Sequence, residues 1–418
     1  MLALLLLLAA PGQAEDWPQF RGPTGQGHAA AKGLPLAWGG EKGENVLWKA
    51  PLVGEGHASP IVIGDRVLLS TVRWPEGKPD PKVVPEQHVL CYSASDGKLL
   101  WDATVEPGPW RREDFRSGPG GGYAAPTPAT DGKRVFVVFA SSVVAALDLD
   151  GKPAWRKEIR PFTFDVTIGT SPVLFGDTVI LHCAMAKPAD SRLVAFSKED
   201  GSVKWEAKQA GVKFGHSTPV LIEVKGKAQL VTLASGMGAA PDAFQAFDPA
   251  DGRRIWWCRG QGDASSPAWG AGILYGDSGR GGGGTAVDPT GEGDVSATHV
   301  RWTAGGLTEA IGSPIVVGEH VYRLQSPGVL RIWKAATGEE TDKARLDRIG
   351  STWASPVADT EGRIYFANGG RSFVVRAGPK VEVLATNDLG DPNHASPAVS
   401  RGRLFIAGLK NLYAIGNR

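Results

Sequence analysis

The stretch that decides the fold is HASPIV at residues 57–62, which returns almost unchanged as HASPAV at residues 394–399. Six further stretches match it: APTPAT (125–130), GTSPVL (169–174), HSTPVL (216–221), ASSPAW (264–269), IGSPIV (311–316) and WASPVA (353–358). Their shared prolines are 68, 44, 47, 48, 47, 42 and 41 residues apart. A repeat of about 40–50 residues is typical of a β-propeller, in which each repeat forms one four-stranded blade.

Each repeat has the same local pattern. Ser-Pro or Thr-Pro begins a short apolar stretch, because proline lacks the N–H of a sheet interior and suits the start of a strand. A third apolar stretch ends in Asp-Gly, which supplies the positive φ of a tight hairpin. We interpret the tryptophan that follows this Asp by five residues as packing the blades together. The pairs are Asp96/Trp101, Asp150/Trp155, Asp200/Trp205 and Asp251/Trp256, with Trp302, Leu346 and Leu384 expected at this place in repeats five, six and seven.

The two ends of the repeat array complete each other. The last repeat stops at LKNLYAIGNR (409–418) without a fourth strand, whereas NVLWKAP (45–51) looks like an outermost strand without the three before it. Pairing them in one blade removes free sheet edges. We therefore predict an all-β fold over residues 45–418, an eight-bladed β-propeller of four-stranded antiparallel blades closed by the N-terminal strand in the last blade.

Composition and the N-terminus indicate an exported chain. Residues 1–14 read MLALLLLLAAPGQA and resemble a secretory signal peptide, with an apolar run shorter than the roughly 20 residues that span a bilayer. Residues 15–44 form a lead segment before the repeats. The 45 Lys and Arg balance 44 Asp and Glu, which gives no electrostatic reason to expect nucleic acid. Three cysteines, Cys91, Cys183 and Cys258, match neither a disulfide framework nor a zinc motif.

The complete repeat, with Ser-Pro, a Gly turn and a pattern LxAxDxxxGxxxW, resembles the pyrroloquinoline-quinone (PQQ) type of propeller repeat. That repeat builds the eight-bladed propellers of quinoprotein alcohol dehydrogenases and of the lipoprotein subunit of the outer-membrane β-barrel assembly machine. DWPQFRGPTGQG (16–27) and GGGGTAVDPTGEGDVSATHVRW (281–302) also resemble a group of exported bacterial propellers called PQQ-binding-like. The resemblance implies the fold, and one propeller architecture hosts many activities.

The chemistry of the quinoproteins does not carry over by motif. The resemblance implies an adjacent Cys–Cys pair beside the quinone, Glu/Asn/Asp ligands for Ca²⁺ and an Asp base, and this chain has no adjacent cysteines and no CxxCH haem motif. No Cys follows the apolar run to carry a lipid. We expect a monomeric, non-enzymatic scaffold that binds an envelope protein partner or a small ligand in the periplasm or another extracytoplasmic space, without catalytic residues, metal or cofactor. The alternative is a PQQ-dependent dehydrogenase that holds the quinone with Ca²⁺ at the channel mouth.

Residues just before each Ser-Pro should ring one mouth of the central channel. The candidate ligand-binding residues there are His57, His216, His394, Trp353, Tyr123 and Glu309. His216 belongs to a blade nearly opposite the other two histidines, so the three cannot share one metal ion, although a site of two histidines stays open. The hydroxyl residue recurs in repeats that lack the histidine, so we expect it to bond local backbone at the strand start rather than to act as a nucleophile.

Two other stretches attract attention. GDSGRGGGG (276–284) is not a phosphate-binding motif and is interpreted as a hairpin. VEPGPWRREDFRSGPGGGY (105–123) joins the first two repeats, and inserted loops rich in Trp and Arg often carry binding. A solvated loop is the open alternative. The candidate interface residues in this loop are Trp110, Arg111, Arg112, Phe115 and Arg116.

Overall fold

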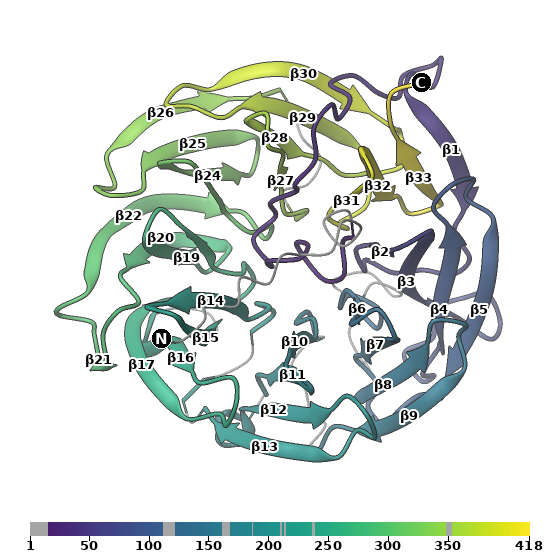
Figure 1. The fold of residues 1–418 in the computed structure, drawn as a ribbon, viewed down its shortest axis with the longest axis horizontal. Coiled ribbons are helices and arrows are strands. Elements are labelled where there is room, and N and C mark those ends of the chain that lie inside the picture. The colour runs from purple at the N-terminus through teal and green to yellow at the C-terminus, as the bar shows by residue number, and fades with distance from the viewer. Residues whose placement is uncertain are drawn as a thin grey trace, which may run out of the picture.

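The computed structural model describes residues 16–111, 122–160, 168–185, 187–209, 211–212, 215–235, 239–347 and 353–418. In this part of the chain the strands form eight sheets, arranged around a common axis (Figure 1). The predicted eight-bladed all-β propeller is thereby confirmed. The only helical element in the same residues is the short 3₁₀ turn η2 (Pro188–Asp190).

Each sheet is one blade, and its strands follow one another from the axis to the rim. Blades one to four contain β2 (Ile61–Ile63), β3 (Arg66–Arg73), β4 (Glu86–Ser93) and β5 (Leu99–Val105); β6 (Ala129–Thr130), β7 (Arg134–Phe139), β8 (Val143–Asp148) and β9 (Pro153–Glu158); β10 (Val173–Phe175), β11 (Thr178–Cys183), β12 (Arg192–Ser197) and β13 (Val203–Lys208); and β14 (Val220–Val224), β15 (Lys227–Leu233), β16 (Ala239–Phe247) and β17 (Arg254–Gln261). A short strand, β21 (Gly293–Asp294), adds to β17 in parallel.

The remaining blades continue the order. Blades five to eight contain β18 (Ala268–Gly270), β19 (Ile273–Asp277), β20 (Arg280–Val287) and β22 (Val300–Glu309); β23 (Ile315–Val317), β24 (His320–Gln325), β25 (Val329–Lys334) and β26 (Glu340–Arg345); β27 (Val357–Ala358), β28 (Arg363–Phe366), β29 (Arg371–Arg376) and β30 (Glu382–Asp388); and β31 (Ala398–Ser400), β32 (Arg403–Ala407), β33 (Asn411–Ile415) and β1 (Val46–Pro51). Each repeat proline directly precedes the innermost strand of its blade, as Pro60 precedes β2. The Gly-rich stretch is the β19–β20 hairpin, as expected.

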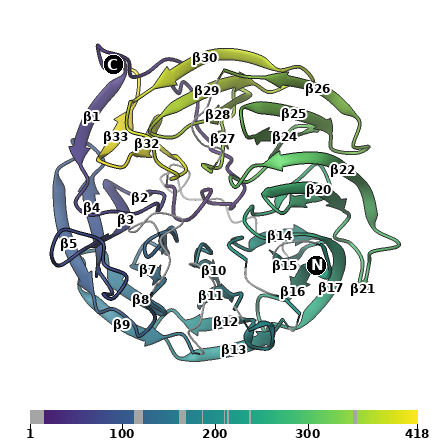
Figure 2. The same ribbon diagram turned by 180° about the vertical axis from the view of Figure 1, so that it is seen from behind.

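The ring closes in blade eight. Strand β1 pairs antiparallel with β33, with Trp48 opposite Ala414 and Ala50 opposite Leu412. The two strands come from opposite ends of the repeat array and lie side by side at the rim in both views (Figures 1 and 2). The predicted closure is confirmed, and it joins the ends of the ring by a full set of strand contacts.

Tryptophans of the outermost strands join neighbouring blades. The indole N–H of Trp101 donates to the Leu149 carbonyl of blade two at 3.0 Å, and its ring covers Gly151 of the same turn. Gly151 has φ +84°, and a Cβ there would lie 2.9 Å from the indole ring, so the turn needs glycine both for its backbone and for the contact. Trp48, Trp155 and Trp302 each donate to a carbonyl of the next blade in the same way.

The residues expected in this place in blades six and seven were wrong. In blade two, Trp155 pairs with Ala146 of the neighbouring strand. The residues that hold the same place in the strand pairing of blades six and seven are Asp342 and Ala385, whereas Leu346 and Leu384 had been predicted. The Asp342 carboxylate accepts the Val381 N–H of blade seven at 2.8 Å, so it still bonds the next turn. Blade eight has no corresponding turn, because its outermost strand comes from the N-terminus, and Ala385 therefore has no turn to cover.

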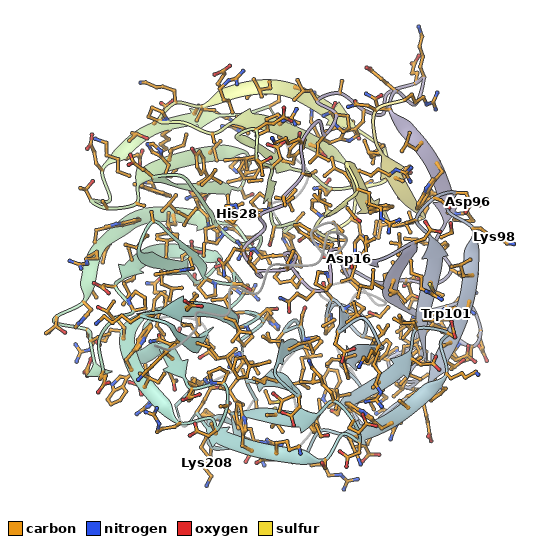
Figure 3. All side chains as sticks on the ribbon, in the orientation of Figure 1. Asp16, His28, Asp96, Lys98, Trp101 and Lys208 are labelled. Atoms are coloured by element: carbon orange, nitrogen blue, oxygen red, sulfur yellow. The ribbon has the colours of Figure 1, made fainter. Side chains whose placement is uncertain are left out.

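The lead segment, described here over residues 16–44, crosses the face of the ring. It starts at blade one, where Trp17 and Val62 exchange both backbone hydrogen bonds at 2.8 and 2.9 Å. It ends on blade seven, where Trp38 N–H donates to the Asn387 side chain at 2.9 Å. Figure 1 shows the purple segment running over the middle, and Figure 3 places Asp16 and His28 there, with Trp101 at the rim.

Arg21 anchors the lead segment between blades five and six. Its guanidinium is fully buried and donates to the carbonyls of Pro267 at 3.1 Å and Pro314 at 2.7 Å. Burial, together with the charge of Arg323, lowers the pKa of Arg21 to about 9. No helix of the described residues is long and apolar enough to cross a membrane.

Candidate functional site

A ring of hydroxyl groups surrounds the axis. Each Ser or Thr of the repeated Ser-Pro unit accepts the backbone N–H of its counterpart in the preceding blade. Ser59 N–H, for example, donates to Thr127 Oγ1, and Ser396 N–H donates to Ser59 Oγ and so closes the circle. The eight bonds measure 2.9–3.2 Å and join Ser59, Thr127, Ser171, Thr218, Ser266, Ser313, Ser355 and Ser396 in that order.

The partners of the hydroxyl ring differ from those expected from the sequence. The hydroxyls were expected to bond local backbone at the strand start, but they bond the neighbouring blade, because each innermost strand lies against the next one around the axis. The serines next to the histidines have the same partners as those without a histidine. They are therefore part of the framework, and their lone pairs are engaged with buried N–H groups.

The hydroxyl ring forms the wall of a cavity of about 170 Å³, here called the cup. Phe20 is part of the cup's lining, so the lead segment that crosses the ring reaches the cup. The residue three positions before each repeat proline lies at the wall of the cup in all eight blades. These residues are His57, Ala125, Gly169, His216, Ala264, Ile311, Trp353 and His394.

An aromatic cluster occupies the cup where blades seven, eight and one meet. The His394 ring stacks on Trp353 with centroids 4.2 Å apart and an interplanar angle of 25°. The His57 ring is tilted by 58° against the His394 ring, with centroids 4.6 Å apart. Asn393 positions both histidines, since its side-chain oxygen accepts the His394 N–H at 2.8 Å and lies 2.5 Å from His57 Nδ1.

The tautomer and charge of this cluster follow from its contacts. Asn393 Nδ2 donates to the Gly408 carbonyl at 2.9 Å, so Oδ1 is the atom that faces His57, and His57 Nδ1 must donate the proton. Burial, and next the neighbouring His57, lower the pKa of His394 to about 4. His394 is therefore neutral at physiological pH, and its ring forms a stacked pair with Trp353 beside the tilted ring of His57.

A polar pair faces this cluster from blade five. Arg280 lies at the wall of the cup, and its Nε donates to Asp263 Oδ2 at 2.6 Å. The Asp263 side chain is 1% exposed, and its backbone carbonyl accepts the N–H of His216 at 2.6 Å. His216 thus lies in the cup but belongs to this polar side and not to the stacked cluster.

The other predicted residues lie elsewhere. Tyr123 is fully buried between Trp74 and Trp110, in the core between blades one and two, and Glu309 is exposed at the end of β22; neither is part of the cup's described lining. Trp110 is half-buried, and Arg111 is exposed and donates to the Lys82 carbonyl at 3.2 Å. Arg112, Phe115 and Arg116 lie outside the described residues.

Sequence reasoning missed Phe20 and Arg280, and it placed Asn393 near the channel mouth without giving it a role. The motif DWPQFRG contains Phe20 and was noted only as a family resemblance. Arg280 lies in the Gly-rich hairpin, and small residues at its neighbouring positions were the only signal that the backbone approaches the axis there. No sequence signal separates Asn393 from an ordinary loop residue.

The described lining of the cup does not suit a PQQ–Ca²⁺ pair. Calcium takes carboxylate and carbonyl oxygens, and no Asp or Glu belongs to that lining. The quinone is a polycarboxylate that calls for several cations, whereas the lining contributes Arg280 alone, already paired with Asp263. A search of the same residues finds no group of three or more His, Cys, Asp or Glu side chains arranged to hold a metal.

Comparison with known proteins agrees with this geometry. A family described as outer membrane protein assembly factor BamB matches residues 85–256. No curated protein gives a significant match over the sequence. Together with the eight-bladed fold, this match over part of the chain supports the resemblance to the PQQ-like propeller repeat.

Solved structures with the same fold include both functional types named above. BamB from Moraxella catarrhalis superposes with a TM-score of 0.60 at 13% identity, over 88% of this chain and 96% of that one. Quinohemoprotein alcohol dehydrogenase from Comamonas testosteroni gives a TM-score of 0.65 at 14% identity, over 98% of this chain and 82% of that one. At such identities the likeness concerns the fold alone.

Proposed function

We propose that this chain is a non-enzymatic, exported β-propeller that binds a protein partner or ligand in the cell envelope, with the cup as its binding site. The observation that carries the proposal is the aromatic cluster of Trp353, His394 and His57 beside a ring of hydroxyls that are all engaged with backbone. Such a surface offers an aromatic platform and a single paired cation. It supplies no activated hydroxyl, because an activated nucleophile needs a base within hydrogen-bond reach.

Several earlier expectations belong to this proposal. A signal peptide at residues 1–14, a separate lead segment at 15–44 and a monomeric propeller at 45–418 fit a secreted binding protein. The match to a family named for outer-membrane assembly supports an envelope partner. Trp110 and Arg111, which lie outside the cup, remain a proposed second contact surface for that partner.

Site-specific photo-crosslinking tests the binding site. A photoreactive phenylalanine analogue replaces Trp353 in the full chain, and irradiation of cells of the source organism should give a defined adduct. The matched control carries the analogue at Lys208, which is exposed on β13 at the rim. A His394→Ala exchange should diminish the adduct at position 353. Equal adducts at both positions, or none at 353, would contradict a binding role for the cup.

The second candidate is a PQQ-dependent dehydrogenase, favoured by the flat face of Trp353, on which a planar cofactor could stack. Titration of the purified chain with PQQ and Ca²⁺, followed through tryptophan fluorescence, tests it together with a dye-linked alcohol or sugar dehydrogenase assay. The binding proposal expects no turnover. Turnover that depends on both PQQ and Ca²⁺ would replace it with the enzyme.

A further inference from the structure

The lead segment bonds the inner edges of some blades and leaves others open. In each blade the residue two positions after the repeat proline points its N–H toward the axis. In blades one, two and seven, the N–H groups of Val62, Thr130 and Ala358 donate to backbone carbonyls of the lead segment at 2.8–2.9 Å. In blade five the Trp269 N–H donates to the Gln26 side chain at 2.8 Å. The backbone of the lead segment thus bonds the inner edges of blades one, two and seven, and a side chain takes its place in blade five.

Blades three and four have the same edge without this partner. Leu174 and Leu221 occupy the equivalent positions, opposite Val179 and Leu230. The Phe175–Thr178 pair flanks a two-residue turn, so strand alternation turns the Leu174 N–H and carbonyl away from β11 and toward the axis. The same alternation turns Leu221 and Glu223 of β14 outward. Among the described residues, no hydrogen bond to these three N–H groups is found.

These two edges border a groove of about 350 Å³. One wall is the lead segment over residues 19–25, and the other is formed by β10 and β14. The walls are mostly apolar: Leu174, Phe175 and Leu221 are half-buried and line the groove. Glu223 is the one charged residue of the described lining, and its side chain is exposed at the end of the groove.

We infer that this groove binds an extended peptide of a partner protein, with apolar side chains at alternate positions and a Lys or Arg opposite Glu223. Unpaired strand edges are templates for strand addition, in which main-chain bonds give affinity and pockets give side-chain preference. The lead segment already binds blades one, two and seven in this manner, so the groove continues an interface that the fold itself uses. The groove is a cavity of its own, although its lining shares Phe20, Thr218 and Ser266 with that of the cup, so the inference does not depend on whether the cup binds anything.

A peptide array on the purified full chain tests the inference. The probes are seven-residue peptides that vary Val, Ile, Leu, Phe and Trp at alternate positions and end in Lys. One control set carries Glu in place of Lys. A second set is N-methylated at alternate residues along one edge, and a third along the other, because a methylated nitrogen cannot donate to a strand edge. We expect binding to Lys peptides, at least fivefold weaker binding to Glu peptides, and loss of binding in one methylated set only.

Two variants locate the bound peptide. Leu221→Pro removes an N–H that no neighbouring strand uses, so the blade should still fold. The variant should no longer bind the peptide, because this N–H is one of the donors that the peptide would use. Glu223→Lys should weaken binding about fivefold or more, in line with the loss of an exposed ion pair and the added repulsion. Glu319→Lys is the matched control, because Glu319 is exposed in the equivalent turn of blade six, outside the groove. Thermal unfolding of each variant shows that it is folded.

Amide hydrogen exchange supplies the independent readout. Peptide binding should slow exchange in β10 and β14 and leave the strands of blade seven unchanged. The inference is overturned if neither methylated set binds more weakly than the unmethylated Lys peptides, if Leu221→Pro binds as the wild type does, or if protection appears around the cup instead. Peptide binding that is equally strong with and without N-methylation would mean that the groove takes up apolar side chains without main-chain bonds, and it would overturn the inference.

Discussion

Replacing Thr218 separates the framework role of the hydroxyl ring from any chemical one. Thr218 Oγ1 accepts the Ser171 N–H at 3.0 Å, and both residues are buried. Thr218→Val keeps the shape of the side chain and removes the acceptor, which leaves the Ser171 N–H buried and unpaired. Such a group costs about 1–3 kcal/mol. Thr218→Ser keeps the acceptor and removes one methyl group, at about 0.8 kcal/mol.

The valine variant should therefore be less stable than the serine variant by up to about 2 kcal/mol. A cooperative unit of this length unfolds with an entropy of about 0.8 kcal/mol/K, so the expected difference in Tm is at most about 3 °C. Urea unfolding and amide exchange at Ser171 are the sharper assays. Exchange at Ser171 should be faster in Thr218→Val and unchanged in Thr218→Ser. Equal stability and equal exchange in the two variants would refute the ring as a structural device.

Three further outcomes follow from the same contacts. Gly151→Ala should destabilise the fold by more than 1 kcal/mol, because it adds strain at φ +84° and pushes against Trp101; Gly176→Ala, with positive φ but no neighbour within 4 Å, is the control, and urea unfolding of the two separates contact from strain. Arg21→Met should loosen the lead segment, which limited proteolysis after residue 21 detects; unchanged cleavage would contradict the anchor. The free energy of unfolding should fall between about pH 6.5 and pH 4, because the unfolded chain protonates His394 while the folded chain, with its pKa lowered to about 4, does not; His394→Gln should flatten this slope, and an unchanged slope would show that other groups cause it.

The blade architecture could be read from the sequence because its signals are local. Ser-Pro at each strand start, Asp-Gly at the hairpin and Trp five residues later each reflect the conformation of a few neighbouring residues. The closure of the ring was also predictable, since the last repeat lacks its fourth strand and residues 45–51 form a strand that lacks the rest of its blade. The alignment failed where no tryptophan marks the outermost strand, so Leu346 and Leu384 were chosen in place of Asp342 and Ala385.

The contacts between blades and across the axis could not be predicted from the sequence. The hydroxyl of Ser59 bonds a residue of blade eight that is 337 positions away, and the sequence records only that a hydroxyl recurs. Tyr123 was assigned to the mouth because it lies close to Thr127-Pro128 in the sequence, but its ring packs against Trp74 in the core between blades one and two. Asn393 and Phe20 acquire a role only through residues brought near by the closed ring.

Function in this molecule has to lie where the repeat is broken. Eight equivalent blades offer eight equivalent inner edges and eight equivalent mouth positions, and symmetry alone cannot distinguish one binding site among them. The lead segment breaks the symmetry, because it bonds the edges of blades one, two, five and seven and leaves those of three and four open. The residues His57, Trp353 and His394 break the symmetry a second time, because the other blades, except blade four, have small or aliphatic residues at this position. The two asymmetries share Phe20 as a wall, so a Phe20→Ala variant should join the cup to the groove and alter binding at both, which neither site alone would predict.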